Sequence, residues 1–304
     1  MNETVLHEFF TTNYLSPACS ESAGHVSVCE QAPVSVVIPA YCAKSTIIDA
    51  IKSVAAQTLR PMEVIVVDDG STDGTADCVK KLIPEYGADW LKLLILDRNQ
   101  GVASARNAGW SMAKSAFIAF LDADDLWHPQ KIQYQYDYFC KNSEAALCGH
   151  AFCNINNMNA CMGLNIKRKV ESIGTSRLLL SNPFVTPSVM LRANLPFRFH
   201  AGKRYMEDHL LWMEISLAGF SVVKLSAPLA LIRKAQFGES GLSAALWKME
   251  KGELHNYWAL WESGRIGLCS MIFLALYSMA KYVRRLMIVT VRSMRWRITK
   301  NVNG

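Results

Sequence analysis

The stretch Phe120-Leu121-Asp122-Ala123-Asp124-Asp125-Leu126-Trp127 decides how this chain of 304 residues is organised. The apolar run at 116–121 predicts a buried strand, and it ends in three carboxylates within four positions. Burying an unpaired carboxylate costs on the order of several kcal/mol. We therefore expect this strand to end at an exposed edge of a sheet.

The spacing of the acidic residues raises the possibility of a metal site. If extended geometry continues past the strand, Asp122 and Asp124 point the same way, because strand side chains alternate. Two hard oxygen ligands suit Mg²⁺ or Mn²⁺, which complete their coordination shells with phosphate oxygens. The alternative is a turn in which aspartate caps a helix.

Two earlier strands end in the same way. The β-branched run at 64–67 leads into Asp68-Asp69-Gly70, and the run at 34–38 leads into Pro39-Ala40-Tyr41. Helical patterns follow the three strands, at 46–57, 75–86 and 129–142. Strands that alternate with helices predict a parallel sheet with right-handed crossovers, and ligands bind beyond the carboxyl ends of such strands.

The order of the motifs resembles glycosyltransferase family 2. The blocks are Val-Ser-Val-Val-Ile-Pro-Ala-Tyr (34–41), Ser-Val-Ala-Ala-Gln-Thr (53–58), Glu-Val-Ile-Val-Val-Asp-Asp-Gly-Ser-Thr-Asp-Gly-Thr (63–75), Asn-Gln-Gly-Val-Ala-Ser-Ala-Arg-Asn-Ala-Gly (99–109) and the stretch 117–127. The resemblance is dense over 34–132 and looser to about residue 245. It is strongest to bacterial enzymes that build capsule, lipopolysaccharide or teichuronic-type polymers.

This resemblance implies an α/β fold of the A-type glycosyltransferase class, with a mainly parallel central sheet flanked by helices and a basic amphipathic C-terminal helical extension. We expect the following division of the chain: a flexible arm at 1–32, a catalytic domain at 33–245 with a nucleotide-sugar half (33–132) and an acceptor half (133–245), and a membrane-associating extension at 246–304.

The resemblance also assigns roles at the donor side. Pro39, Ala40 and Tyr41 match the wall that binds the base, where the tyrosine ring can stack. Asp69 matches the carboxylate that accepts a hydrogen bond from a base N–H. Arg106 can reach phosphate or ribose, or hold the Asp122 carboxylate.

The metal and the catalytic base follow from the same comparison. Asp124 would contact Mn²⁺ or Mg²⁺ directly, and Asp122 would contact the ribose or the metal through water. The metal would neutralise the departing nucleoside diphosphate. Asp208 matches the base that removes the proton of an acceptor hydroxyl. The alternative is that Glu-Asp, directly before an apolar helical segment, only caps that helix and supplies the acidic residues of its first turn. Asp125 is better explained as a cap for the following helix.

The activity implied is inverting transfer of a sugar from a nucleoside-diphosphate sugar to a hydroxyl of a glycan or lipid-linked glycan, in cell-surface polysaccharide synthesis. One departure from the family is the lack of a histidine at 231–243, where Arg233 or Lys234 could instead help to neutralise the pyrophosphate. A nucleotidyltransferase is the alternative, but residues 39–44 lack its glycine-rich phosphate loop. The other alternative is a membrane-associated scaffold protein with a degenerate, inactive site, and the intact aspartates of the motifs argue against it.

The charge is concentrated at the C-terminus. The net charge is +6, and the segment 281–304 holds seven basic residues and no acid. The remainder is close to neutral, so nucleic acid is not an expected partner. The apolar segment 266–280 falls short of the roughly 20 residues that span a bilayer. We expect an interfacial helix on anionic lipid, or alternatively a packed helix, and therefore a cytoplasmic protein, peripheral on the inner face of the membrane.

The cysteines indicate free thiols in a reducing compartment, because nine are scattered without a Cys-x-x-Cys pair. The group Cys148, His150, Cys153 and Cys161 fits no zinc spacing.

Overall fold

The computed structural model describes residues 31–155, 169–233 and 245–302, with side chains described as far as residue 288. Within these residues one sheet has the strand order β3-β2-β1-β4-β8-β6-β9-β5, with β7 paired to β9. The strands are β1 (Gln31–Ala40), β2 (Arg60–Asp68), β3 (Leu91–Ile95), β4 (Phe117–Phe120), β5 (Leu126–Trp127), β6 (Ala145–Asn154), β7 (Val170–Ser172), β8 (Met190–Arg192) and β9 (Ser221–Ile232).

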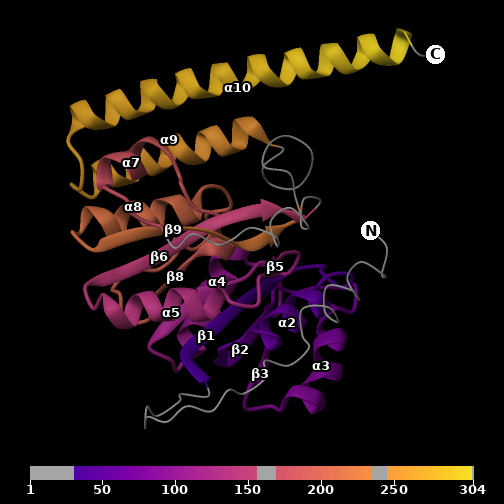
Figure 1. Ribbon diagram of the computed structural model, residues 1–304. Coiled ribbons are helices and arrows are strands. Elements are labelled where there is room, and N and C mark those ends of the chain that lie inside the picture. Colours follow the sequence, from indigo (N-terminus) through magenta and orange to yellow (C-terminus); the bar gives the residue numbers. More distant parts are fainter. Residues whose placement is uncertain (1–30, 156–168, 234–244, 303–304) are drawn as a thin grey trace.

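The helices cover both faces of this sheet (Figure 1). They are α2 (Ile47–Ala55), α3 (Thr75–Tyr86), α4 (Val102–Met112), α5 (Lys131–Lys141), α7 (Thr175–Leu180), the 3-10 turn η2 (Thr186–Ser188), α8 (Glu207–Leu217), α9 (Leu246–Glu262) and α10 (Leu268–Val302). The fold is therefore α/β with a mixed, mostly parallel sheet, as the sequence predicts.

The parallel half of the sheet follows from its β-branched strands. In the register of β1, Val36 lies opposite Val64 of β2, and Val37 lies opposite Phe120 of β4. Successive side chains enter opposite cores, because strand residues alternate between faces. Val36 packs with residues of α2, α3 and α5, whereas Val37 packs with residues of α4, α7, α8 and α9. These long apolar runs are typical of strands that are buried on both faces.

One local prediction is wrong. Asp125 does not cap a helix: α5 begins at Lys131 without a side-chain cap, and Asp125 Oδ1 accepts a hydrogen bond from Arg233 N at 3.0 Å. Asp125 therefore attaches the end of β9 to the turn that follows β4.

The C-terminal helix α10 lies outermost, stacked on α9, and its C-terminal half extends beyond the body of the molecule (Figure 1). Its inner face is polar as well as apolar. Lys281 Nζ donates to Glu253 Oε1 at 2.7 Å, and Ser278 Oγ donates to Glu250 Oε1 at 2.7 Å. Arg285 also faces Glu253, at 3.9 Å. At least Lys281 and Arg285, of the seven basic residues at 281–304, thus face a carboxylate within the fold.

The outer face of α10 is hydrophobic. Phe273 and Leu276 are 61% and 67% exposed, and the other exposed apolar residues of the helix are Leu268, Ile272, Tyr277, Val283, Leu286, Met287 and Ile288. Across the described parts of the chain, no helix combines the length and the apolar character needed to cross a bilayer. The predicted domain division lies partly outside the described residues, but α9 begins at Leu246, the first residue of the predicted extension.

The cysteine prediction fails at one residue. Cys153, at the end of β6, is disulfide-bonded. Cys161 lies outside the described residues. Five described cysteines are free thiols: Cys42, Cys78, Cys140, Cys148 and Cys269.

Gly109 sets the distance between α4 and the sheet. A Cβ placed at Gly109 would lie 2.5 Å from Val37 Cγ1 and 3.1 Å from Val67 Cγ2, both on buried strands. These β-branched side chains have little rotamer freedom with which to yield. The absence of a side chain at this position therefore lets α4 approach β1 and β2.

We predict that Gly109→Ala lowers the free energy of unfolding by about 1–3 kcal/mol through overpacking, despite the better helix propensity of alanine. Urea unfolding measures the change. Gly267→Ala is the matched control, because nothing lies within 4 Å of a Cβ at that position. Equal stability of the two variants would contradict the close approach.

Candidate active site

The loops after β1 and β2 are held together at the carboxyl edge of the sheet. Three backbone N–H groups of the first loop donate to side chains of the second, in the pairs Cys42 N to Ser71 Oγ (2.9 Å), Ala43 N to Thr75 Oγ1 (2.9 Å) and Lys44 N to Asp73 Oδ2 (3.0 Å). Tyr41 is 55% exposed beside this junction, whereas Ala40 is buried. The edge thus presents a free aromatic ring on a fixed backbone.

Asp69 is buried and fixes the start of α4. Its two carboxylate oxygens accept hydrogen bonds from the backbone N–H groups of Gln100 (2.7 Å) and Gly101 (2.8 Å). The neighbouring Asp68 accepts a bond from Ser71 N at 2.9 Å and so closes the turn after β2. The sequence did not indicate this use of Asp69, which orders the N-terminus of α4, the helix that carries Arg106.

Arg106 connects two parts of the chain that are distant in sequence. Its Nη2 donates to Asp122 Oδ1, and its Nη1 donates to Glu207 Oε1, each at 2.8 Å. The guanidinium is buried and lies 5.3 Å from the ring centre of Phe199. Burial alone would lower the pKa of Arg106, but the carboxylates of Asp122 and Glu207 raise it. Of the predicted contacts of Arg106, the structure shows the one to Asp122.

The acidic segment after β4 is a turn rather than a continued strand. Asp125 N donates to the Asp122 carbonyl at 3.0 Å, which ends the extended geometry at once. The argument from alternating strand side chains therefore does not apply to Asp122 and Asp124. Both side chains are nevertheless partly exposed, and they belong to one tight turn at the strand end.

Asp208 lies in the first turn of α8 and is partly exposed. Its Oδ2 accepts hydrogen bonds from Thr186 Oγ1 at 3.0 Å and from Asn182 Nδ2 at 3.5 Å. Its Oδ1 accepts a hydrogen bond from His209 N at 2.6 Å. Asp208 therefore has a fixed orientation, and its side chain remains partly exposed. Neither Thr186 nor Asn182 stands in a recognisable motif, so sequence reasoning missed them.

Sequence reasoning also missed the role of Glu207. It is buried against Arg106, and burial raises its pKa to about 7, although the cation beside it acts in the opposite direction. The adjacent Asp208 charge raises the pKa of Glu207 further. Its position directly before Asp208 was the only available signal.

The residues that could hold a metal are few. Within the described residues, no group of three or more His, Cys, Asp or Glu side chains is placed to hold an ion. The carboxylates of Asp122 and Asp124 fit Mg²⁺ or Mn²⁺ only where phosphate or water supplies most of the ligands, which is common for these ions. Arg233 is committed elsewhere, since its Nη2 pairs with Asp49 at 2.8 Å, and Lys234 lies outside the described residues.

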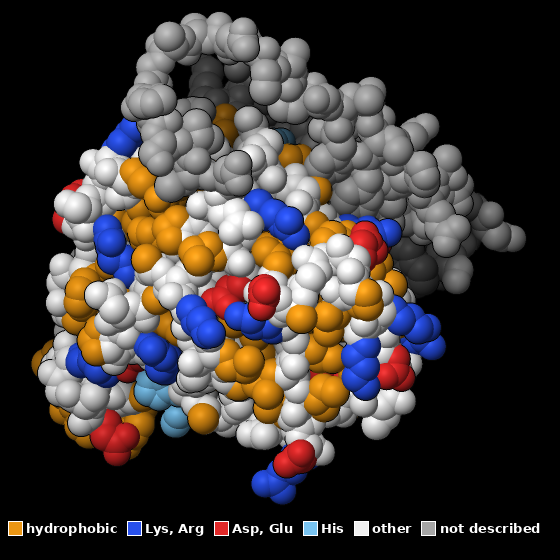
Figure 2. Space-filling model, turned by 90° about the horizontal axis from the view of Figure 1, so that it is seen from below, with side chains coloured by type: hydrophobic (Ala, Val, Ile, Leu, Met, Phe, Trp, Pro, Cys, Tyr) orange, Lys and Arg blue, Asp and Glu red, His pale blue; other side chains and the backbone are white. Residues whose placement is uncertain are grey.

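Comparison with known proteins identifies the family. Residues 35–196 match the sequence profile of Glycosyl transferase family 2. The chain belongs to this family. Figure 2 shows that basic, acidic and hydrophobic side chains are intermixed on one face of this glycosyltransferase, without a continuous field of either sign there.

Two curated relatives of this chain are bacterial proteins named as glycosyltransferases. It is 32% identical over 182 residues to the Escherichia coli protein UDP-Glc:alpha-D-GlcNAc-diphosphoundecaprenol beta-1,3-glucosyltransferase WfgD, covering 60% of this chain and 69% of WfgD. It is 28% identical over 222 residues to the Bacillus subtilis putative teichuronic acid biosynthesis glycosyltransferase TuaG, covering 72% of this chain and 84% of TuaG.

Solved structures share the fold. The S. aureus TarS fragment 1-349 in complex with UDP-GlcNAc has a TM-score of 0.62 at 19% identity, covering 83% of this chain and 72% of TarS. The mannosyltransferase PcManGT from Pyrobaculum calidifontis, in complex with GDP-Man and Mn²⁺, has a TM-score of 0.60 at 15% identity. The match covers 90% of this chain and 80% of PcManGT. At these identities the likeness shows the fold alone.

The raised pKa of Glu207 predicts a pH-dependent stability. Because this pKa exceeds the ordinary value of 4.5, the folded state binds the proton more tightly than the unfolded state. The resulting stabilisation is complete below pH 4.5 and is lost as the pH rises through about 7. The free energy of unfolding of the wild type should therefore include a fall of about 2–3 kcal/mol between these pH values that is due to Glu207. The Glu207→Gln variant should lack this fall.

Urea unfolding at pH 4.5 and pH 8 measures this decline, and Glu262→Gln, on the exposed end of α9, is the control. Glutamine retains an oxygen that accepts from Arg106 but cannot titrate. A Glu207→Gln variant with the same decline as the wild type would show that Glu207 has an ordinary pKa.

Proposed function

We propose that this glycosyltransferase moves a sugar from a nucleoside-diphosphate sugar to a hydroxyl of a glycan or lipid-linked glycan, with inversion at the anomeric carbon. The observation that carries the proposal is the double contact of Arg106, which joins the acidic turn after β4 to the first turn of α8. A donor diphosphate at Asp124 and an acceptor hydroxyl at Asp208 would thus meet at one place. The WfgD and TuaG relationships support bacterial surface polysaccharide as the product.

The donor would lie along the carboxyl edge of the sheet. The exposed Tyr41 ring offers a stacking surface for the base, with Pro39 and Ala40 forming the wall behind it. Each Asp69 oxygen already accepts one backbone bond, and a carboxylate oxygen has a further lone pair that a base N–H could use. The donors bound to TarS and PcManGT support a nucleotide sugar as substrate.

The leaving group would be stabilised at the acidic turn. Asp124, with Asp122 directly or through water, would hold Mn²⁺ or Mg²⁺, and the Mn²⁺ bound to PcManGT supports this choice. Such an ion supplies Lewis-acid neutralisation of the charge that develops on the diphosphate. Arg106 keeps Asp122 oriented, because the guanidinium holds one of its two oxygens.

Asp208 would act as the general base. Its carboxylate takes the proton of the acceptor hydroxyl while the oxygen forms a bond to the anomeric carbon. The bond from that carbon to the diphosphate oxygen breaks, and its electron pair leaves with the nucleoside diphosphate. A single displacement of this kind inverts the configuration. Thr186 holds Oδ2 of Asp208 at 3.0 Å and so fixes the direction of the carboxylate.

The acceptor side would face a membrane through α10. The outer face of this helix exposes Phe273 and Leu276, an arrangement typical of helices that lie in a lipid interface. Arg284 is exposed, and the four remaining basic residues beyond it lie where side chains are not described: Arg292, Arg295, Arg297 and Lys300. We infer peripheral attachment at the cytoplasmic face, where anionic lipid would attract these charges.

We expect Asp124→Ala to abolish the stimulation of UDP binding by Mn²⁺ and nearly all transfer, because the metal loses its direct ligand. Calorimetry with UDP, with and without Mn²⁺, measures binding, and a nucleotide-sugar panel measures turnover. Asp89→Ala, exposed before β3, is the control. Full turnover by Asp124→Ala, or by the wild type in excess chelator, would refute the metal site.

Asp208→Asn should slow transfer by about 10²-fold or more, because the amide cannot accept the proton. UDP affinity should change little, since the variant retains the shape of the side chain. Nuclear magnetic resonance of the product identifies the anomeric configuration. A product with retained configuration would exclude the single displacement, and unimpaired turnover by Asp208→Asn would exclude Asp208 as the base.

Phe273→Glu with Leu276→Glu should weaken binding to anionic phospholipid vesicles by about tenfold or more, because two large apolar side chains no longer enter the interface. Co-sedimentation measures the bound fraction. Ile95→Glu, exposed at the end of β3, is the control. High salt should weaken the attachment of the wild type without abolishing it. Unchanged binding by the double variant would contradict the interfacial role of α10.

A further inference from the structure

A basic pocket lies between the segment before α8 and the first half of α9. Its volume is about 310 Å³, and its lining includes the cationic residues Lys203, Arg204, Lys248 and Lys251, together with His255 and Gly252. No acidic residue lines it. We call this feature the basic pocket. It is an open hollow on the surface, in which Arg204, Lys248 and Lys251 are exposed.

The two walls of the basic pocket are fastened to each other. Lys203 Nζ donates to the Gly252 carbonyl at 3.3 Å, and the buried Asn256 donates through Nδ2 to the Met206 carbonyl at 2.9 Å. A Cβ at Gly252 would lie 2.8 Å from the Tyr205 carbonyl oxygen, so the backbones touch here. The pocket is therefore a preformed feature and not a chance grouping of surface lysines.

Its positive charge is poorly compensated. Among the described residues, no carboxylate forms an ion pair with Lys203, Arg204, Lys248 or Lys251. Burial lowers the pKa of Lys203 to about 8, with only a partial opposing effect from Glu207. A bound anion would relieve this cost, because an opposite charge nearby favours the protonated amine.

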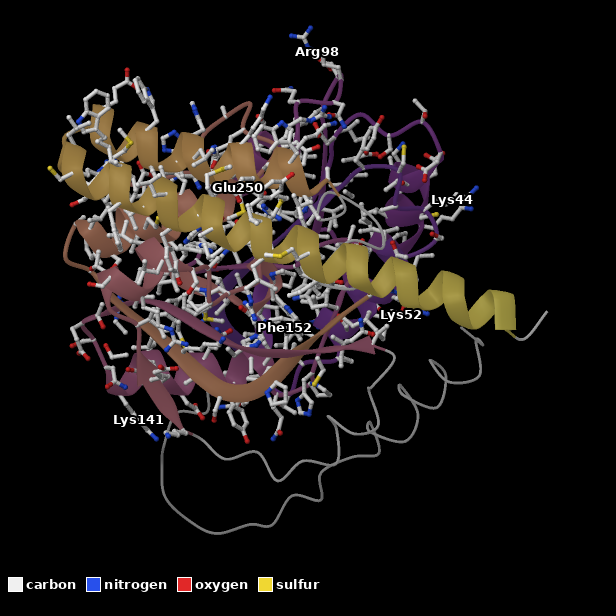
Figure 3. All side chains as sticks on the ribbon, turned by 90° about the horizontal axis from the view of Figure 1, so that it is seen from above. Lys44, Lys52, Arg98, Lys141, Phe152 and Glu250 are labelled. Atoms are coloured by element: carbon white, nitrogen blue, oxygen red, sulfur yellow. The ribbon has the colours of Figure 1, made fainter. Side chains whose placement is uncertain are left out.

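The basic pocket adjoins both the proposed base and the proposed membrane face. Tyr205 precedes Asp208 by three positions in the chain, so their Cα atoms are at most about 11 Å apart. On its other side α9 packs against α10, where Glu250 lies between the two helices (Figure 3). Trp247, next to Lys248, contacts Tyr282 of α10 at 5.5 Å between ring centres.

We propose that the basic pocket binds the diphosphate of a lipid-linked acceptor and so presents the acceptor sugar to Asp208. This inference rests on the proposed function. The donor diphosphate is assigned to the turn after β4, which leaves the basic pocket for a second phosphorylated group. The acceptor sugar would then extend from the pocket toward Asp208, whose Cα lies within about 11 Å of that of Tyr205 in the pocket wall. The lipid tail would leave toward α10, which packs on α9. Charge complementarity favours a diphosphate, because several cations line the pocket and no carboxylate of the described residues forms an ion pair with them.

The test compares Lys248→Glu/Lys251→Glu with Lys81→Glu/Lys141→Glu, which makes the same change of charge at exposed positions on α3 and α5 (Lys141 is labelled in Figure 3). Inorganic pyrophosphate is titrated into each full-length protein in chelator, which prevents binding through a metal. The wild type and the control should bind it equally, and the pocket variant at least about tenfold more weakly, because two charge-assisted contacts become repulsive.

Two further measurements separate the possible failures. Hydrolysis of a nucleotide sugar in the absence of acceptor tests the proposed function and should be equal in the three proteins. Transfer to short-chain alkyl diphosphate sugars, compared with the same sugars as neutral alkyl glycosides, tests the pocket. The pocket variant should raise KM for the diphosphate acceptors alone, without lowering kcat.

Absence of both hydrolysis and transfer in the wild type would refute the proposed function. Normal hydrolysis with equal pyrophosphate binding in all three proteins would instead refute the basic pocket. Loss of anionic vesicle binding by the pocket variant, with no pyrophosphate binding in the wild type, would show a site for phospholipid headgroups and would also overturn the proposal.

Discussion

The constraint on which the site depends is the electrostatic compensation of one buried guanidinium. Arg106 is buried, so its charge must be balanced within the protein, and the two carboxyl groups that contact it are Asp122 and Glu207. Leaving such a buried charge without any partner typically costs about 3–5 kcal/mol. The fold can satisfy this requirement only if α4, the end of β4 and the start of α8 converge, and these same three segments carry the proposed donor, metal and base positions.

Much of the predicted nucleotide-sugar half, residues 33–132, was predictable because its signals are local. The β-branched runs specify buried parallel strands, and parallel strands place their carboxyl ends at one edge; Asp69 and Asp122 were located in this way. The prediction failed where a hydrogen bond replaced a regular pattern. Asp122 and Asp124 belong to a turn, and Asp125 binds the backbone of β9 rather than capping α5.

The acceptor half was less predictable because its contacts join residues far apart in sequence. Nothing near Thr186 marks it as a partner of Asp208, and nothing near Glu207 marks it as a partner of Arg106. The basic tail was recognised from composition, but its division into an inner face that pairs with Glu253 and an outer apolar face required the packing of α10 on α9. These features together place the proposed chemistry beside a proposed lipid surface.

The most direct test of this account is a double-mutant cycle on the two partners of Arg106, read as the free energy of unfolding. Asp122→Asn and Glu207→Gln each leave one carboxylate to balance the guanidinium, whereas the double variant leaves none. We predict that the double variant is less stable than the sum of the single effects by at least about 1 kcal/mol. Effects that add to within about 0.5 kcal/mol would contradict the account, because Arg106 would then not couple the donor turn to the helix of the base.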